Sequence, residues 1–548
     1  MSERITDIAT EADTGSGYGD SGPEGSERDG RAPSTDLGWP GAGLARWLTR
    51  RRLFWAVFIF ASLAYVQTQF WTQASAGDRA NWDYFAQVIS RGGVPYRDVV
   101  NIKSPLSAYI GAAAIVVTRP FGLRDLLAIR VAFVLLAALV VSFTFLVAHD
   151  YFESRLIALL ASVIMLSFGA FARLNGGGVQ PKTPMLLFGL ITLWAILKDR
   201  AVTAGVFGML SALSWQPGLL FVGVAGLAFS RYLTSWRDLK VLKLLSGAAI
   251  PLAIQLGYFW AVGALSDFYL WNIHFNATVY GPGQVRSMAG FSRRIAKMMT
   301  GTYHAGRFFF LLAAPGVATA VWQAWQRARP GGLRGLVDDA PRHAIIIAPV
   351  VYFLFCTIDI QGGADLIPLL PFVAVFSALA IVLAVRQATR LISRWRPSLG
   401  RLPLEAAGIA LIVLFAVVLG IRQTLARERD FPSLAEQDAE VHEIVSYLAP
   451  GDKIFVHGNA EILVLSGLTN ASKYFLLDRG KDGYLDKVEQ GGFKGWLDRL
   501  KSERPKVVAL DRLKSLSYGD EFKEWIETDY DEHQGRIFTY YVRKENLR

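Results

Sequence analysis

Long apolar runs recur along this chain between residues 53 and 425, and several of them approach the roughly 20 residues that cross the hydrocarbon core of a bilayer. Hydrophobic residues make up 52% of the 548 residues, and a chain of this length could otherwise form two or three soluble domains. The concentration of apolar residues in runs excludes that interpretation for most of the chain. The sequence therefore predicts an α-helical polytopic membrane protein.

The apolar runs predict about eleven spans, at residues 53–70, 126–148, 156–172, 185–197, 202–215, 218–229, 244–265, 308–325, 344–358, 366–385 and 406–425. The run at 106–117 is too short to cross comfortably and carries Gly111, so we expect it to lie in the outer interface of the membrane. Gln216 and Pro217 alone join two of the short spans. We expect that junction to be buried in protein, because unpaired backbone is not tolerated against lipid.

The positive charges predict the orientation of these spans. Arg50, Arg51 and Arg52 stand directly before the first span, which favours a cytoplasmic N-terminus. An odd number of spans then places the C-terminal part outside the cytoplasm. Much of the net charge of +11 lies in short loops between apolar runs, so it indicates topology, and we see no patch for nucleic acid.

Three regions follow from this pattern. Residues 1–45 are rich in Gly, Ser, Asp and Glu and are predicted to form a disordered cytoplasmic tail. Residues 46–425 form the membrane domain, with a first outer loop at 71–124. Residues 426–548 have the composition of a small extracytoplasmic α/β domain. Its strand-like runs at 453–457, 474–477, 507–510 and 537–542 alternate with helical patterns at 436–448, 461–465, 493–501 and 521–527.

The first outer loop contains the residues best suited to chemistry. A carboxylate at the membrane surface, such as Asp78 or Asp98, can act as a general base towards an acceptor hydroxyl. The amine of Lys103 can offset the charge of a leaving phosphate. The alternative is that all three are the charges of a solvated loop. For Asp83, beside Trp82, a place on a helix face is the favoured interpretation.

Other charged residues lie near the ends of the predicted spans. Arg130 enters an apolar span, where a cation indicates function or else reaches back to the interface. Asp365 at a helix entrance either contacts substrate or caps the helix. Lys182 either binds a phosphate or headgroup or simply flanks a span.

Two possible cofactor sites are not supported by the spacing of their residues. His274 and His304 lack the spacing of metal ligands, so we predict no metal site or other cofactor, and a divalent cation has no support. The Gly176-Gly177-Gly178 run does not follow a strand and lacks the Lys-Ser pair of a nucleotide-binding loop.

Within residues 78–109 the order and spacing of the residues resemble those of the GT-C class of membrane glycosyltransferases, in particular bacterial relatives of the protein O-mannosyltransferases and of the aminoarabinose transferases that modify lipid A. In that class an Asp after the first span is followed eight residues later by a small residue, then by a G-x-P-Y turn and a K-P-P-L-x-x-Y segment. The corresponding residues of this chain are Asp78, Ala86, Gly93-Val94-Pro95-Tyr96, and Lys103-Ser104-Pro105-Leu106 with Tyr109. The later run DLIPLLPF is similar to the Y-L-L-P-L-L-P span of the class.

This resemblance implies a bundle of spans with interfacial helices in the first outer loop, and a polyprenyl-phosphate sugar as donor. It implies transfer of a hexose or pentose to a lipid, glycan or protein acceptor, with inversion at the anomeric carbon. Asp78 would be the catalytic carboxylate and Lys103 would bind the donor phosphate. The remaining residues predicted to contact substrate are Tyr96, Asp98, Arg130, Lys182 and Asp365.

The sequence also departs from that pattern. Arg79 stands where an acid usually follows the catalytic Asp, and Gln180-Pro181-Lys182 stands where many relatives carry a second acid. Trp215-Gln216-Pro217 replaces a common Lys-Gly-Pro. These departures favour one acid with several cations over a two-carboxylate or metal-assisted site.

The predicted function is a multi-pass transferase of the cell membrane that moves a sugar from a polyprenyl-phosphate carrier to an acceptor on the outer face. A transporter or lipid flippase of the cell envelope is the main alternative, since bundles with intramembrane charges also carry solutes. It predicts repeated halves with broken helices at mid-membrane, whereas the charges of this chain gather at one face. A non-enzymatic assembly or receptor protein that acts through its tail is the third.

Overall fold

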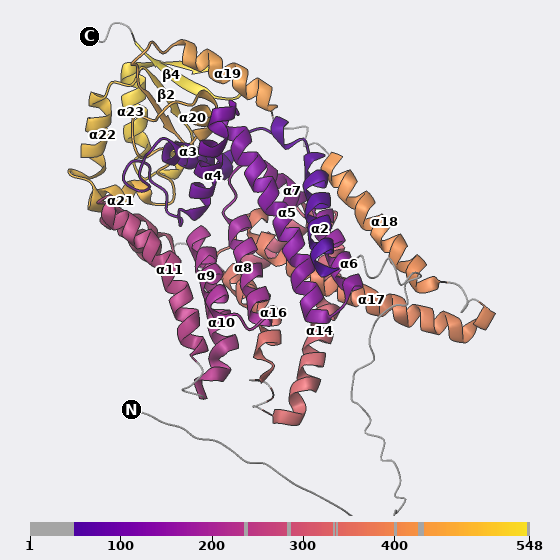
Figure 1. Ribbon diagram of the computed structural model, residues 1–548. Helices are drawn as coiled ribbons and strands as arrows, with labels where there is room; N and C mark the ends of the chain where they lie inside the picture. Colours follow the sequence, from indigo (N-terminus) through magenta and orange to yellow (C-terminus); the bar gives the residue numbers. More distant parts are fainter. Residues whose placement is uncertain are drawn as a thin grey trace, which may run out of the picture. The chain divides into compact units, whose positions relative to one another are not determined.

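The computed structural model describes residues 49–234, 239–281, 287–332, 335, 338–398, 403–425 and 432–544. The tail predicted at residues 1–45 lies outside these ranges. Helices dominate up to residue 425, and a small sheet with its helices follows, as Figure 1 shows.

Within the described ranges, seven helices are long and apolar enough to cross a membrane, and the 62° bent pair of α6 (Arg155–Ser167) and α7 (Gly169–Gly176) raises this number to eight. The seven are α2 (Arg50–Val66), α5 (Asp125–Phe152), α11 (Lys240–Ala261), α14 (Arg307–Ala328), α16 (Ala340–Ile358), α17 (Leu370–Trp395) and α18 (Leu404–Leu425). Shorter apolar helices include α8 (Lys182–Leu197), α9 (Ala201–Ser214) and α10 (Leu219–Phe229). Each of the eleven predicted segments is therefore helical, and the protein is a multi-pass membrane protein. The count of eleven spans stays a prediction.

Two of these helices form the centre of the bundle. The most apolar windows of α5 and α17 are 67% and 89% buried, against 17–28% for the other five long helices. A helix that is apolar on all sides is stable inside protein or against lipid. The exposed apolar faces of α11, α14, α16 and α18 are thus the surfaces that lipid would cover.

The first outer loop folds into two helices, α3 (Gly77–Ser90) and α4 (Leu106–Thr118), which lie against each other beside the end of α5 (Figure 1). The Ser107 hydroxyl donates a hydrogen bond to the Ser214 carbonyl at 3.0 Å. The Gln216 amide donates to the Ile102 carbonyl at 3.0 Å, and Trp215 is buried. The junction between α9 and α10 is therefore covered by protein, which confirms the prediction made for it.

The long loop between the predicted spans 244–265 and 308–325 is more structured than its sequence indicates. It forms α12 (Leu265–Phe268), two π-helical turns (Tyr269–His274 and Asn276–Tyr280) and α13 (Met288–Thr300). A π-helical turn has no recognisable spacing of apolar residues, so the 3.6-residue pattern could not reveal it. Phe291 and Met298 on α13 are buried, and Arg294 of the same helix donates a hydrogen bond to the Ile360 carbonyl at 3.3 Å.

The C-terminal region is a four-stranded sheet in the order β1-β2-β4-β3, formed by β1 (Ile454–His457), β2 (Val507–Leu510), β3 (Tyr530–Gln534) and β4 (Thr539–Arg543). β1 and β2 are parallel, and the other two pairs are antiparallel. Its helices are α19 (Leu434–Ser446), α20 (Ala460–Ser466), α21 (Lys481–Val488), α22 (Gly492–Ser502) and α23 (Gly519–Asp529). The predicted α/β layer is thus present.

One predicted strand of this region is wrong. Residues 474–477 run beside β1 without joining the sheet. The Phe475 carbonyl accepts a hydrogen bond from Gly458 at 2.9 Å, but the next donor, the Leu477 backbone N–H, bonds the His457 ring at 3.0 Å. A side chain thus takes the place of the ladder partner, and the sheet's fourth strand is β3.

The sheet domain shares its core with the first outer loop. Buried apolar residues of α3, such as Phe85, belong to one cluster with Val456 of β1 and Ile462 of α20. Any cavity beside α3 is therefore bounded by residues that are far apart in the sequence.

Candidate functional site

Four of the residues predicted from the sequence line one cavity of about 530 Å³, called here the central cavity: Asp78, Lys103, Lys182 and Asp365. Asp78 lies in the first turn of α3, and Lys103 precedes α4. Lys182 is the first residue of α8, and Asp365 lies in a 3₁₀ turn before α17. All four are at or near helix ends, so the fold gathers polar groups at one end of the bundle.

Lys103 presents an ammonium group to the cavity without a close counter-charge. Its Nζ lies 4.3 Å from the centre of the Tyr280 ring, a cation–π contact. Of the carboxylates that the structure describes, none forms an ion pair with it. Burial lowers the pKa of Lys103 to about 8. A half-buried cation that lacks a paired anion is a suitable site for an anionic ligand.

Lys182 and Asp365 form an ion pair with 3.2 Å between Nζ and Oδ1. Lys182 also lies over the Trp215 ring at 4.4 Å. The other oxygen of Asp365 accepts hydrogen bonds from the backbone N–H groups of Gln361 and Gly362 at 2.7 and 2.9 Å. Asp365 therefore caps its turn, the structural role considered for it, and also contributes to the cavity wall.

Replacing Asp365 by Ala should destabilise the fold, because it leaves two backbone donors and the Lys182 ammonium without partners in a mostly buried place. We expect the free energy of unfolding to fall by about 2–4 kcal/mol. Thermal unfolding of the purified protein measures the change. The control, Lys182→Met, keeps both backbone hydrogen bonds and should cost less. An equal or larger loss in that control would contradict the capping role.

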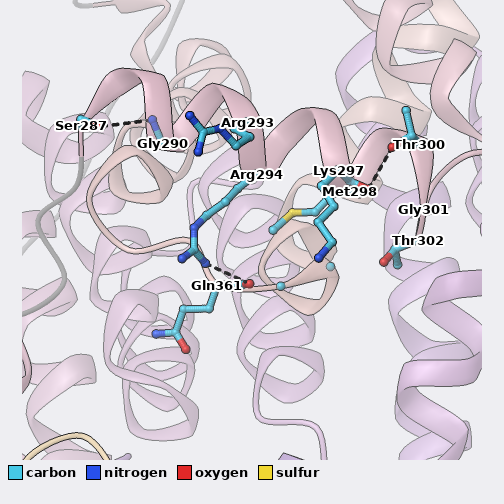
Figure 2. Close-up of a pocket in the computed structure, with 12 residues that line it drawn as sticks. Ser287, Gly290, Arg293, Arg294, Lys297, Met298, Thr300, Gly301, Thr302 and Gln361 are labelled. Carbon is cyan, nitrogen blue, oxygen red and sulfur yellow. Dashed lines mark hydrogen bonds between the residues drawn. The ribbon is translucent and has the colours of Figure 1, made fainter.

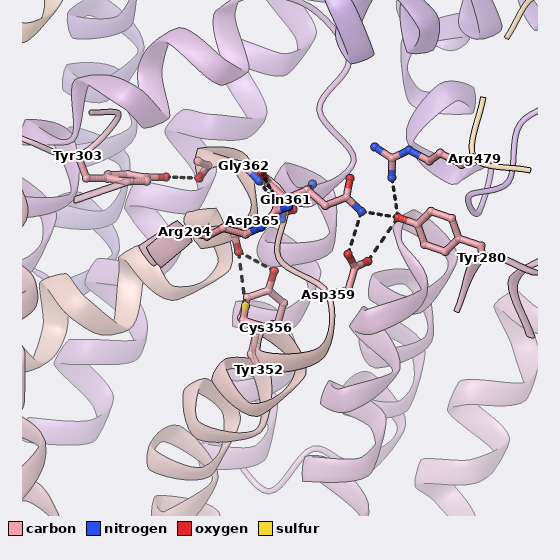
Figure 3. Close-up of polar contacts among 12 residues, drawn as sticks. Tyr280, Arg294, Tyr303, Tyr352, Cys356, Asp359, Gln361, Gly362, Asp365 and Arg479 are labelled. Atoms are coloured by element: carbon pink, nitrogen blue, oxygen red, sulfur yellow. Dashed lines mark hydrogen bonds and ion pairs between the residues drawn. The ribbon is translucent and has the colours of Figure 1, made fainter. Parts of the chain in front are cut away.

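A second set of polar residues, which the sequence did not reveal, surrounds the Tyr280 hydroxyl (Figure 3). This hydroxyl accepts hydrogen bonds from the Gln361 amide at 2.6 Å and from the Arg479 guanidinium at 3.0 Å, and donates to Asp359 at 3.4 Å. All four residues line the central cavity. A usable signal was the charged sequence Asp478-Arg479-Gly480-Lys481, directly after a strand-like run.

The balance of charge in the cavity differs from the expectation of one acid with several cations. Four aspartates line it, namely Asp78, Asp359, Asp365 and Asp478. Asp365 is paired with Lys182, and Asp478 is paired with Lys481 at 2.8 Å. Among the described side chains, no group of three His, Cys, Asp or Glu residues is close enough to hold a metal ion, and the independence from metal stays a prediction.

Three residues predicted to contact substrate are not part of the cavity wall. Tyr96 is buried, and its hydroxyl donates to the Lys103 carbonyl at 2.7 Å. Asp98 accepts a hydrogen bond from the Val94 N–H at 2.7 Å, and its contact with Arg97 lowers the pKa of its carboxyl. Arg130 is fully buried in α5 and donates to the Phe70 carbonyl at 3.0 Å. Tyr96 and Arg130 are thus buried supports of the fold, whereas Asp98 is exposed and stabilises its own turn.

The three glycines at 176–178 also have a structural explanation. A Cβ on Gly177 would meet the Arg79 guanidinium at 2.1 Å, and a Cβ on Gly178 would meet the Asp83 carboxylate at 2.3 Å. Asp83 is fully buried, accepts the Val179 N–H at 2.7 Å, and has its pKa raised to about 7 by burial. The glycines thus allow the segment that leads to Lys182 to lie directly against α3.

Replacing Gly178 by Ala should therefore destabilise the protein. Its φ of +147° disfavours any L side chain, and the added methyl would displace the buried Asp83 carboxylate. We expect the free energy of unfolding to fall by about 3 kcal/mol or more. The matched control is Gly223→Ala in α10, where an added Cβ meets nothing within 4 Å. Folded yield and thermal unfolding of both variants test this, and an equal response would contradict it.

Two further hollows adjoin the central cavity. The larger, about 850 Å³, is called here the cationic hollow, because Arg293, Arg294 and Lys297 of α13 line it (Figure 2). It shares the segment 361–363 with the central cavity. None of the described residues that line it carries a carboxylate.

The second hollow is an apolar groove of about 510 Å³ on the other face of α13. Ile295 and Met299 of α13 line it, together with apolar residues of α14, α16 and α17. α13 thus lines both the cationic hollow and the groove, and the turn Gly363–Leu369 contributes residues to all three hollows.

No protein-family model matches this sequence. No curated protein matches it either. Solved structures do match over most of the chain. ArnT from Cupriavidus metallidurans, bound to undecaprenyl phosphate, has 13% sequence identity and a TM-score of 0.58, with 90% of this chain and 98% of that chain covered.

The archaeal oligosaccharyltransferase AglB from Archaeoglobus fulgidus, in complex with an inhibitory peptide and a dolichol-phosphate, has 14% identity and a TM-score of 0.52. The match covers 91% of this chain and 75% of AglB. At this level of identity the likeness concerns the fold. The chain therefore has the GT-C fold that the motif at residues 78–109 predicted.

Proposed function

We propose that the protein is a membrane glycosyltransferase that moves a sugar from a polyprenyl-phosphate carrier to an acceptor at the outer face of the membrane. The observation that carries this proposal is that Asp78 and Lys103 line the same cavity, next to a cationic hollow and an apolar groove. The two structures compared above hold polyprenyl phosphates, undecaprenyl phosphate in ArnT and dolichol-phosphate in AglB.

The three hollows suit the three parts of such a donor. The groove between α14, α16 and α17 takes the isoprenoid tail, since its lining is almost wholly apolar. The cations of α13 attract the phosphate as the donor enters, and the phosphate and its sugar then pass the segment 361–363 into the central cavity, where Lys103 lies.

The reaction is a displacement at the anomeric carbon. Asp78 accepts the proton of the acceptor hydroxyl while the oxygen of that hydroxyl forms a bond to the anomeric carbon. The bond from this carbon to the phosphate oxygen breaks, and the carrier phosphate leaves with the electron pair. Lys103 and Lys182 lie where they stabilise that charge. A single displacement of this kind inverts the anomeric configuration.

The positions of the charges argue against the transporter alternative. Transport across the bundle requires polar groups at mid-membrane. Lys103, Lys182 and Asp359 lie at helix ends on the side of the bundle that carries the sheet domain, as do Asp78 and Asp365. Polar groups so placed suit chemistry at one membrane face.

The test is to incubate the purified full chain in nanodiscs with a panel of labelled polyprenyl-phosphate sugars and a lipid, glycan or peptide acceptor. We expect release of free carrier phosphate with one of these donors, matched by sugar on an acceptor. Comparing the anomeric configuration of donor and product checks inversion. Carrier-dependent transport of sugar across the bilayer without bond cleavage would refute the proposal.

A further inference from the structure

The C-terminal domain forms part of the wall of the central cavity. Its segment 475–481 contributes Phe475, Leu476, Asp478, Arg479 and Lys481 to the lining. These residues lie about four hundred positions after Asp78 in the sequence. Figure 3 shows Arg479 on the opposite side of the segment 361–365 from Arg294. The domain therefore reaches the site from the side away from the cationic hollow.

Arg479 and Lys103 lie beside the same aromatic ring. The Arg479 Cζ is 5.6 Å from the centre of the Tyr280 ring, and the Lys103 Nζ is 4.3 Å from it. The hydrogen bond to the Tyr280 hydroxyl uses one of the five N–H donors of Arg479. The guanidinium is thus oriented by the protein and still has donors for a ligand.

The Asp478 carboxylate, next to Arg479 in the sequence, mainly pairs with Lys481 and not with Arg479. Asp478 lies 2.8 Å from Lys481, whereas its distances to Arg479 and Arg512 are both 3.8 Å. Lys182 is likewise paired with Asp365. Lys103 and Arg479 are the two cavity cations beside Tyr280, and the single Asp359 carboxylate at the Tyr280 hydroxyl leaves one positive charge for an anionic ligand to neutralise.

Buried hydrogen bonds fix the C-terminal domain against the segment that precedes Asp78. The Ser75 N–H donates to the Gln437 side-chain oxygen at 2.8 Å, and the Gln437 amide donates back to the Ser75 carbonyl at 2.7 Å. Glu461 accepts the Gly77 N–H at 2.7 Å. These side chains are buried, and breaking each bond costs about 1–3 kcal/mol. The position of Arg479 relative to Asp78 is therefore fixed by the fold.

We propose that Arg479 of the C-terminal domain, together with Lys103, binds a phosphoryl or similar anionic group in the central cavity. This inference rests on the proposed function and assigns the C-terminal domain a direct part in substrate binding. Arginine matches the oxygens of a phosphoryl group with two parallel N–H donors. The group belongs either to the carrier phosphate or to an anionic acceptor.

Arg512 provides a matched control. It lies at the same 3.8 Å from Asp478 and is similarly exposed, but it is not among the residues that line the cavity. Arg479→Gln and Arg512→Gln therefore remove the same charge next to the same aspartate. Arg479→Lys keeps the charge and loses the two-donor geometry, and it should show an intermediate effect.

The experiment uses the full chain in nanodiscs and measures the Kd of undecaprenyl phosphate and the KM of the acceptor. If the group is the carrier phosphate, Arg479→Gln should raise the Kd about tenfold or more. If it is on the acceptor, the Kd should stay constant and the acceptor KM should rise by a similar factor.

Values for Arg479→Gln that equal those of Arg512→Gln in both measurements would overturn the assignment of Arg479, provided that Asp78→Asn is inactive. If the unmodified protein neither binds undecaprenyl phosphate nor transfers sugar, the proposed function fails and the assignment of Arg479 fails with it. Equal thermal unfolding of the two Gln variants shows that the comparison is between folded proteins.

Discussion

Replacing Asp78 by Asn is expected to lower the rate of sugar transfer by about 10²–10⁴-fold, the contribution of a positioned general base. Asn keeps the size and shape of the side chain but cannot accept the proton of the acceptor hydroxyl. Asp78 is exposed towards the cavity, so the fold should tolerate the exchange. Single-turnover transfer from a bound donor is the measurement, because it separates the chemical step from binding.

The matched control is Asp125→Asn. Asp125 also stands in the first turn of a helix, α5, and does not line the cavity. Both variants lose the favourable contact of a carboxylate with a helix N-terminus, about 0.3–1 kcal/mol. Asp125→Asn also loses an ion pair with Arg91 at 3.5 Å, so it is the more demanding control for folding. We expect near-normal transfer with Asp125→Asn and an unchanged affinity for undecaprenyl phosphate with Asp78→Asn. Transfer by Asp78→Asn at the rate of the unmodified protein would remove Asp78 from the mechanism.

The sequence predicted the membrane part of the site because short-range rules apply there. Asp78 and Lys103 are 25 residues apart in one connection between spans, so any fold that obeys the topology brings them to the same face. Lys182 and Asp365 precede apolar runs, and the alternation of spans returns both to that face. Whether they would meet was not predictable, because their contact depends on how α8 and α17 pack.

The contribution of the C-terminal domain was not predictable from local pattern. The bond between Ser75 and Gln437 joins residues 362 positions apart, and no propensity or periodicity specifies such a pair. For the same reason, the buried position of Arg130 could not be predicted from the sequence. Its depth in a span indicated function, but its position beside the Phe70 carbonyl depends on where the first outer loop folds back over α5.

Tyr96 shows what a sequence motif cannot predict. The G-x-P-Y motif drew attention to it, yet its φ of +69° and its hydrogen bond to the Lys103 carbonyl give it a supporting role. A motif indicates which residues matter. Whether such a residue contacts the substrate or supports its neighbours depends on the backbone conformation.

Replacing Lys103 by Met should weaken the binding of undecaprenyl phosphate and slow transfer by about 10²–10³-fold, comparable to the loss of one donor that stabilises a developing oxyanion. The pH dependence of binding is the more specific test. With the pKa of Lys103 near 8, the ammonium is charged at neutral pH and loses its proton above pH 8. An anion binds the charged form, so affinity should fall as the pH rises from about 8 to 10.

Titration of the carrier phosphate would not cause this loss of affinity between about pH 8 and 10. A phosphate monoester has its second pKa at about 6 and already carries its full charge in that pH range. Lys103→Arg keeps its charge to about pH 12, and its affinity should therefore stay constant up to pH 10. Lys103→Met should bind weakly at every pH.

The stability of the empty protein should change in the opposite direction. Between about pH 8 and 10.4, the unfolded chain holds a proton on Lys103 that the folded protein has lost, and the free energy of unfolding contributed by this group rises with pH. The difference in thermal unfolding between the unmodified protein and Lys103→Met isolates that contribution. Affinity and stability that change in the same direction with pH would show that the buried amine of Lys103 is not the group that binds the phosphate.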